Sequence, residues 1–354
     1  MGPHPAVAQI RREVRRSLSG LHPGDLVLAA CSGGPDSLAL AAALAFEAPR
    51  AGLRAGGVTV DHGLQDGSAQ RAAAVTGTLA ALGLDPVSAV TAAVARRGAR
   101  AAAVADAAPA DVPARPGAPA AGTGPYRGPE GAARDARYAA LAAAAAGAGA
   151  VAVALGHTLD DQAETVLLGL ARGSGARSLA GMAPRSGSYL RPLLAVRRTA
   201  TLAACAALGL EPWRDPHNTD PSFSRARVRG QLLPALTDVL GPGVAEALAR
   251  SAGQLRADAD LLDQLAAAQS LLLAGPDGSL AAAALGELPA AIRSRILRAA
   301  AVTAGCPAGA VSARHVRALD ELVTCWHGQG AADLPGGVRC RRRYGRLLFS
   351  RRSG

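Results

Sequence analysis

Short apolar runs alternate with longer amphipathic stretches through the first half of this chain. The runs that are bounded by turn residues, as buried strands are, lie at 26–28, 57–60, 86–90 and 151–155. The stretches in which apolar residues recur at helical spacing are 37–46, 68–82, 132–146 and about 159–171. Strands that alternate with helices predict an α/β fold with a parallel sheet.

Two changes in this pattern divide the chain. From residue 91 to about residue 130, Ala, Gly, Pro and Arg follow one another without apolar periodicity, which predicts a flexible insert. After Pro212 a turn-rich segment leads into helices that extend to about residue 268, and a basic β-hairpin with its turn at 335–337 follows near the end. We therefore expect an α/β domain over 1–212, a turn and helical connection over 213–245, and a mainly helical domain over 246–354 that ends in a small β-hairpin.

The charge of the chain indicates a polyanionic partner. Its 354 residues include 38 Lys and Arg residues against 27 Asp and Glu residues, which gives a formal net charge of +11, and none of the basic residues is lysine. A basic excess of this size is typical of proteins that bind nucleic acid.

Other features narrow the class of protein. No run reaches the ~18 uncharged apolar residues that a membrane span requires, and no apolar signal core follows the N-terminal RREVRR stretch. We therefore expect a cytoplasmic protein without a membrane partner. The five cysteines are scattered, without a C-x-x-C pair or a Cys/His cluster, so the sequence indicates neither a disulfide framework nor a zinc or iron–sulfur site.

The turn between the first strand and the first helix is rich in glycine and hydroxyl groups. It consists of Ser32, Gly33, Gly34, Pro35, Asp36 and Ser37. Such a turn lies at the carboxyl edge of a parallel sheet, where glycines let the backbone approach an anion and the helix N-terminus attracts it. Asp36 would repel a phosphate unless a cation lay between them, which predicts Mg²⁺ there. The alternative is an ordinary turn in which Ser37 is the N-cap.

A second polar cluster follows the strand at 151–155, in the sequence GHTLDDQAE. At helical spacing Asp160, Asp161 and Glu164 fall on one face. Such a cluster of carboxylates can bind a substrate ammonium group and take a proton from it. The alternative is that Thr158 and Asp161 form a capping box, which leaves Glu164 unexplained.

These residues carry a resemblance to a known family. The SGGPDS turn resembles the PP-loop of the N-type ATP pyrophosphatases, which split ATP into AMP and pyrophosphate. The further motifs are VDHGL at 60–64, ARDARY at 133–138, GHTLDDQAETVLL at 156–168, RGSG at 172–175, RPLL at 191–194 and WRDPHNTDPSFSRARVR at 213–229. Together, over about residues 26–240, they resemble the tRNA(Ile)-lysidine synthetases, and LPGGVRCRRRYGRLL at 334–348 is similar to the end of that family's C-terminal domain.

The resemblance implies a reaction, its substrates and its domains. A PP-loop ATP-pyrophosphatase domain would adenylate the wobble cytidine of the isoleucine tRNA with a CAU anticodon, and L-lysine would then be attached to C2 of that base. The C-terminal domain would bind the tRNA, ATP and Mg²⁺ would be required, and a homodimer is an assembly to be tested. One departure is Ala226, which replaces the asparagine that is usual between Arg225 and Arg229 in this family.

The residues and the resemblance together assign roles. Asp36, Asp161 and Glu164 are the expected catalytic residues, and Asp36 is the expected ligand of Mg²⁺. Besides the loop from Ser32 to Ser37, the expected ATP-binding residues are Asp61, His62, Gly156 and His157. The expected lysine-binding residues are Arg134, Asp161 and Glu164. The expected tRNA-binding residues are Arg137, Arg191, Arg225, Arg227, Arg229, Arg339, Arg341 and Arg343.

Strand alternation separates the arginines of the terminal hairpin. Arg339, Arg341 and Arg343 should share one side, which we expect to face RNA, while Arg342 should point to the other side with Cys340 and Tyr344. Two other functions remain open: a PP-loop enzyme of the tRNA 2-thiocytidine type, against which the lack of a C-x-x-C pair counts, and an RNA-binding protein without catalytic activity.

Overall fold

The structure is a computed structural model that describes residues 2–61, 63, 67–92, 129–173, 175–213 and 220–351. His62 and residues 93–128, which make up most of the predicted insert, lie outside the described residues. The described residues divide into two compact units, one within residues 2–254 and the other within residues 255–351.

The first unit is built on a parallel sheet, as the sequence predicts. Its described strands are β1 (Leu26–Ala30), β2 (Arg54–Asp61), β3 (Val87–Thr91), β4 (Ala152–Leu155), β5 (Arg185–Ser186) and β6 (Tyr189–Leu190), in the order β3-β2-β1-β4-β6-β5. The pairing is parallel except between β5 and β6. The chain runs outward from β1 to β3 and then returns to place β4 on the other side of β1. Ligands bind at such a switch point, and the loops after β1 and β4 both end there.

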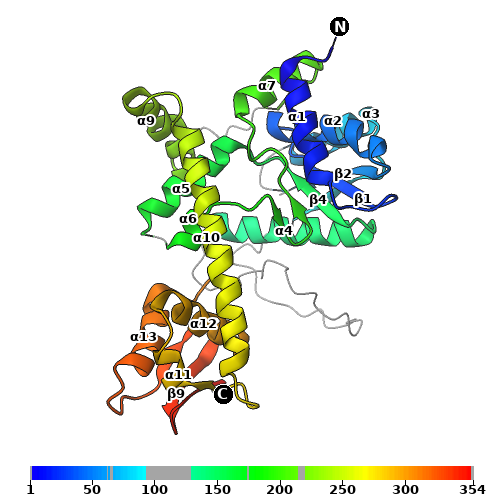
Figure 1. The fold of residues 1–354 in the computed structure, drawn as a ribbon. Coiled ribbons are helices and arrows are strands. Elements are labelled where there is room, and N and C mark those ends of the chain that lie inside the picture. Colours follow the sequence, from blue (N-terminus) through cyan, green and yellow to red (C-terminus); the bar gives the residue numbers. More distant parts are fainter. Residues whose placement is uncertain are drawn as a thin grey trace. The chain divides into compact units, whose positions relative to one another are not determined.

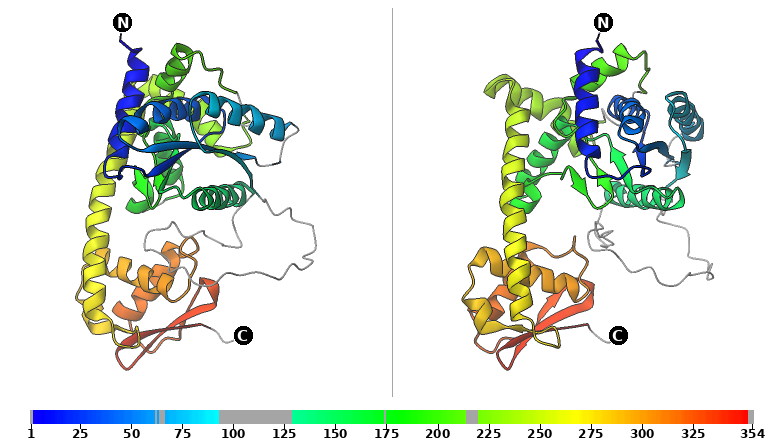
Figure 2. Two further views of the ribbon diagram at one scale, coloured as in Figure 1. Left: turned by 90° about the vertical axis from the view of Figure 1, so that its right-hand side faces the viewer. Right: turned by 45° about the vertical axis from the view of Figure 1, so that its right-hand side comes forward.

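Helices cover both faces of this sheet (Figures 1 and 2). On one face lie α1 (Pro5–Leu18), α2 (Pro35–Arg50), α3 (Ser68–Ala81) and α7 (Arg198–Ala207), and on the other lies α4 (Pro129–Gly147). Helices α5 (Leu159–Ala171) and α6 (Ala176–Leu179) also belong to this unit. Alternate residues of β1 pack in two hydrophobic cores, one on each face of the sheet. Val27 and Ala29 pack in the core that includes α1, α2 and α7. Leu26 and Leu28 pack in the core that includes α4. Because both faces of β1 are buried, it reads in the sequence as a continuous apolar run.

Helix α1 was not predicted, although its apolar residues have helical spacing. Val7, Ile10, Val14 and Leu18 are buried, but the arginines between them dominate this stretch of sequence. One of these arginines, Arg15, binds the buried carboxylate of Glu47 in α2 through both oxygens, with N–O distances of 2.8 and 3.0 Å. The arginine-rich stretch therefore belongs to a helix that packs on the sheet domain.

Further helices follow in chain order: α8 (Ser224–Arg227), the π-helix η2 (Val228–Leu232), α9 (Leu233–Leu240) and α10 (Val244–Leu273). Helix α10 crosses the boundary between the two units. Within the described residues no single helix is long and apolar enough to cross a membrane. One pair, 224–240 with 244–273, passes by length and composition alone and is bent by 99°.

The second unit carries more β-structure than the sequence predicts. The expected hairpin is present as β8 (Ala332–Leu334), a 3-10 turn at Pro335–Gly337 and β9 (Val338–Arg343). A second hairpin continues through Tyr344 and Gly345, both at positive φ, into β10 (Arg346–Arg351), which also pairs with β7 (Leu280–Ala281). The described strands form an antiparallel sheet that packs with helices α11 (Ala282–Gly286), α12 (Ala290–Thr303) and α13 (Ala313–Thr324).

A close backbone approach brings the loops after β1 and β4 together. A Cβ atom on Gly156 would lie 3.0 Å from the backbone nitrogen of Ser37 and 3.1 Å from the carbonyl carbon of Asp36. We therefore expect Gly156→Ala to destabilise the protein by about 1–3 kcal/mol, because backbone atoms cannot move aside as a flexible side chain can. Unfolding in urea measures the change.

Gly77→Ala is the matched control, since Gly77 lies in α3 and a Cβ there meets nothing within 4 Å. Alanine should leave the stability at this position unchanged or slightly raised, because it favours the helix. Equal unfolding midpoints for the two variants would contradict the close approach at Gly156.

Candidate functional site

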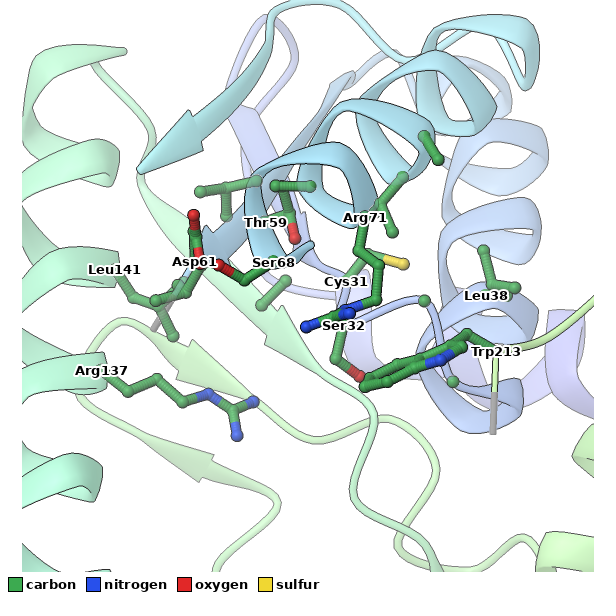
Figure 3. A pocket seen from close by; sticks show the side chains of 18 of the residues that line it. Cys31, Ser32, Leu38, Thr59, Asp61, Ser68, Arg71, Arg137, Leu141 and Trp213 are labelled. Atoms are coloured by element: carbon green, nitrogen blue, oxygen red, sulfur yellow. The ribbon is translucent and has the colours of Figure 1, made fainter. Parts of the chain in front are cut away.

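A cavity of about 700 Å³ opens beside the loop after β1. The predicted site residues that line it are Ser32, Gly33, Gly34, Asp61, Arg134, Arg137, His157 and Arg225. Figure 3 shows Arg137 of α4 pointing into it from one side and Trp213 bordering it on the other. The volume lies in the range of small-ligand pockets, so it can hold a nucleotide.

The loop after β1 keeps its backbone exposed to this cavity. Gly33 has φ +83°, and a Cβ there would lie 2.9 Å from Val75 Cγ2, so this position requires glycine. Helix α2 begins at Pro35 with Gly34 as its N-cap and no side-chain cap. The alternative in which Ser37 is an ordinary N-cap is therefore wrong: Ser37 Oγ instead accepts from the Ser32 N–H at 3.1 Å and donates to the Gly34 carbonyl at 3.0 Å. An uncapped helix N-terminus behind a glycine loop is a ready site for an anion.

Sequence reasoning missed part of the cavity wall. Arg71 of α3 lies over the ring of Trp213, 4.9 Å from its centroid, and the backbone N–H of Trp213 donates to the Gly33 carbonyl at 2.9 Å. Trp213 belongs to a recognised motif, but no spacing rule connects it with α3, which lies more than a hundred residues earlier. The pair gives the cavity a flat aromatic and cationic wall.

His157 lies at the cavity with a depressed pKa. Burial is the main cause that lowers the pKa of His157 to about 3; Asp161 opposes this shift, whereas Arg137 and Arg191 contribute to it. The imidazole is therefore neutral at pH 7. Its Nδ1 atom is buried and has no hydrogen-bond partner among the described residues, which leaves one ring nitrogen available to a ligand.

The predicted catalytic carboxylates do not line this cavity; they form a cluster with arginines, which we call the acid–arginine cluster. Its members are Asp36, Asp160, Asp161, Glu164, Arg197, Arg198, Arg225 and Arg229. Glu164 is fully buried, and Arg229 binds both of its oxygens at 2.7 and 3.1 Å. The capping box of Thr158 and Asp161 is also present, so the structure contains both the capping interaction and the acidic face.

Arg198 lies at the centre of the acid–arginine cluster. Its Nε donates to Asp36 at 3.1 Å, its Nη2 donates to Asp161 at 2.8 Å, and its Nη1 is 3.6 Å from Glu164. Burial would lower the pKa of Arg198, but Asp161, Asp36 and Glu164 raise it above its ordinary value. Burial raises the pKa of Asp36, which Arg198 and a hydrogen bond from Thr201 only partly offset.

Asp36, the expected ligand of Mg²⁺, already has hydrogen-bond partners within the acid–arginine cluster. Both oxygens of Asp36 accept hydrogen bonds, one from Thr201 and the other from Arg198. Within the described part of the chain, no three His, Cys, Asp or Glu side chains gather in a way that would hold a metal ion. A cation that took most of its ligands from phosphate and water would need only one carboxylate, which is the common arrangement for Mg²⁺.

The expected tRNA-binding arginines of the first unit lie in several environments. Arg225 and Arg229 contact Glu164 in the cluster. Arg191 is buried and donates to the Ala183 carbonyl at 2.9 Å. Arg227 is exposed and donates to the Pro221 carbonyl at 3.0 Å. Arg134, which is expected to bind lysine rather than tRNA, is exposed at the cavity, where its guanidinium lies 5.0 Å from the ring centroid of Tyr138.

Comparison with known proteins assigns the chain to a family. The PP-loop domain family matches residues 7–236, and the TilS substrate binding domain family matches residues 280–348. A tRNA(Ile)-lysidine synthase of Thermobifida fusca is 56% identical over 350 residues, which cover 99% of each chain. Proteins with the same description from Streptomyces coelicolor and Mycobacterium tuberculosis are 52% and 44% identical, over 99% of this chain and 99% and 96% of theirs.

The chain belongs to the tRNA(Ile)-lysidine synthase family. A solved structure, the U34-tRNA thiolase NcsA of Methanococcus maripaludis, matches with a TM-score of 0.54 at 18% identity, over 71% of this chain and 79% of that one. That likeness confirms the fold class of the PP-loop domain. The family membership confirms the resemblance inferred from the motifs, and with it the use of ATP by a ligase that acts on tRNA.

In the region that matches the substrate binding domain family, the arginines of β9 lie on the two sides of the strand as alternation predicts. Arg339, Arg341 and Arg343 are exposed, while Val338 and Cys340 are buried on the other side. Arg342 donates to the Leu322 and Val323 carbonyls at 3.0 and 3.2 Å, which tethers β9 to the end of α13. The prediction for Tyr344 is wrong: this residue lies in the turn and is 92% exposed.

Proposed function

We propose that this chain attaches L-lysine to C2 of the wobble cytidine in the isoleucine tRNA with a CAU anticodon, through an adenylated tRNA and with conversion of ATP to AMP and pyrophosphate. Family membership supports the reaction. The observation that carries the proposal for this chain is the placement of a glycine-rich anion loop and an acidic helix at the same switch point of one sheet.

In the first step, cytidine O2 would attack the α-phosphorus of ATP. A P–O bond to the base forms, the bond to the β-phosphate breaks, and pyrophosphate leaves with the electron pair. The backbone of Ser32–Ser37 and the N-terminus of α2 would hold the leaving group. Asp36 would hold Mg²⁺, which when bound neutralises charge on the phosphates. Asp61, Gly156 and neutral His157 would border the rest of the nucleotide.

In the second step, the lysine side-chain amine would attack C2, and AMP would leave with the former O2. Asp161 and Glu164 would bind the ammonium group and accept its proton. Burial would raise the pKa of Asp161, but Arg198 and Arg229 lower it below its ordinary value, so Asp161 is ionised and can attract the ammonium group. Arg134, exposed at the cavity, would bind the lysine carboxylate, and Arg137 a tRNA phosphate.

The exposed face of β9 would bind the tRNA backbone. Its three arginines, Arg339, Arg341 and Arg343, project from a paired strand, so the spacing of their charges is fixed by the sheet. Arg339 also contacts Asp333, which leaves Arg341 and Arg343 as the stronger candidates for phosphate contacts. Four further arginines are also expected to bind tRNA, namely Arg191, Arg225, Arg227 and Arg229. Each of them already contacts a carbonyl or a carboxylate within the protein, and these contacts compete with binding of a phosphate.

The proposal includes location and assembly. ATP, lysine and tRNA are available together in the cytoplasm, where we place the reaction.

The homodimer is supported by a stripe of exposed leucines on α10 that recurs at helical spacing, namely Leu261, Leu265 and Leu272.

The first test is direct. The protein, incubated with ATP, Mg²⁺, labelled lysine and a CAU-anticodon isoleucine tRNA transcript, should transfer label to RNA and release AMP and pyrophosphate. Glu164→Gln keeps the shape of the side chain but removes the charge that would bind the ammonium group. We expect this variant to accumulate adenylated tRNA or to show a raised KM for lysine.

Asp36→Asn tests the adenylation step, as Glu164→Gln tests the transfer of lysine. It should abolish adenylation while tRNA binding is retained, because Asp36 serves the phosphates rather than the RNA. Release of ADP and orthophosphate by the unsubstituted protein would overturn the proposed reaction. Normal lysine dependence with failed ATP binding in Glu164→Gln would instead assign Glu164 to the nucleotide.

A second prediction concerns the β9 face. Arg341→Gln should weaken tRNA binding and reduce the slope of log affinity against log salt by about one unit, because one phosphate contact with its released counterions is lost. Arg342→Gln is the matched control. It should lower the unfolding midpoint, since Arg342 holds the end of α13, and leave the salt slope unchanged.

Titrations of tRNA binding at several salt concentrations measure these slopes. If Arg341→Gln and the triple change at Arg339, Arg341 and Arg343 both leave affinity and slope at their original values, the β9 face does not bind RNA. Its arginines would then only keep an exposed sheet soluble.

A further inference from the structure

Arg198 contacts carboxylates of both α2 and α5, and the proposed function assigns these two helices to different steps of the reaction. Asp36 lies in the first turn of α2, beside the anion loop, and Asp161 and Glu164 lie on α5. One guanidinium lies within 4.0 Å of all three carboxylates and donates hydrogen bonds to Asp36 and Asp161. Because guanidinium is planar and its donors point in fixed directions, it constrains the relative orientation of the groups that it binds.

The position of Arg198 is itself fixed from several sides. Its backbone N–H donates to Asp160 at 2.7 Å, which attaches the start of α7 to α5. One turn further along α7, the hydroxyl of fully buried Thr201 donates to the second oxygen of Asp36. The first turn of α7 therefore holds both oxygens of Asp36 and contacts three acids of α5.

We propose that Arg198 is a positioning residue for both chemical steps: it holds the Asp36 carboxylate beside the anion loop and the Asp161–Glu164 pair in one fixed arrangement. The proposal rests on the proposed function. If Arg198 acts in this way, its loss must impair adenylation and lysine transfer together, whereas loss of Asp36 or Glu164 impairs mainly one of them.

The experiment measures the two half-reactions separately. Adenylation is followed as AMP-linked tRNA formed without lysine, and transfer is followed as lysine addition to tRNA that has already been adenylated. Arg198→Ala should slow each half-reaction by about 10- to 100-fold, the range expected when reacting groups are misplaced by about an ångström. Guanidinium ion, at a concentration too low to unfold the protein, should restore part of both rates.

Arg197→Ala is the matched control from the same turn. Arg197 is adjacent and also pairs across to α5, with Asp160 at 3.3 Å, but its other partner is Glu246 and it contacts none of the three proposed catalytic carboxylates. This variant should keep both half-reactions near the original rates and show no response to guanidinium. Arg198→Lys, which keeps the charge, serves if Arg198→Ala does not fold, and it too should slow both half-reactions.

Distinct results separate the two claims. If the unsubstituted protein forms no lysidine, the proposed function fails. If it forms lysidine but the Arg198 variants slow only one half-reaction or neither, the positioning role fails. The role also fails if Arg197→Ala slows both half-reactions equally, or if guanidinium restores neither rate in Arg198→Ala.

Discussion

The buried carboxylate of Glu164 is the constraint on which the rest of the site depends. Transfer of a carboxylate from water into a protein interior costs several kcal/mol unless other charges and hydrogen bonds compensate. Glu164 has no exposed surface, and the compensation comes from Arg198, Arg225 and Arg229, which lie 34 to 65 positions later in the chain. The first turn of α7 and the α8–η2 segment must therefore lie against α5 for the fold to form.

Apolar packing between α5 and the segment that follows α8 supports the same arrangement. Leu159 and Ala163 pack with Val228 and Leu233, so η2 contacts α5 through apolar side chains as well as through Arg229. A π-helix adds a residue to one turn and is frequent at functional sites. Here it contains Arg229, which reaches Glu164 and Asp161. The carboxylates of Asp161 and Glu164 are thus held in fixed positions by arginine side chains as well as by the packing of α5.

The parts of the fold with local signals were predictable from the sequence. Strand β1, the glycine loop and α5 each have a recognisable sequence pattern within a few residues, and the predicted bounds of α5 agree with the observed ones. The partners of the carboxylates were not predictable, because Arg198 and Asp36 are 162 positions apart and no periodicity connects them. Strands β7 and β10 were missed for the same reason, since two-residue β7 becomes a strand only by pairing with the end of the chain.

A double-mutant cycle between Glu164 and Arg229 tests the central claim most directly. The free energy of unfolding would be measured for Glu164→Gln, Arg229→Gln and the double variant. Glu164→Gln should cost about 3 kcal/mol, because it leaves the arginines around it uncompensated. The double variant should cost less than the sum of the single changes by about 1 kcal/mol or more, since the second change removes a charge that the first left unpaired. Costs that add to within about 0.5 kcal/mol would contradict the account, because Glu164 would then be stabilised by something other than Arg229.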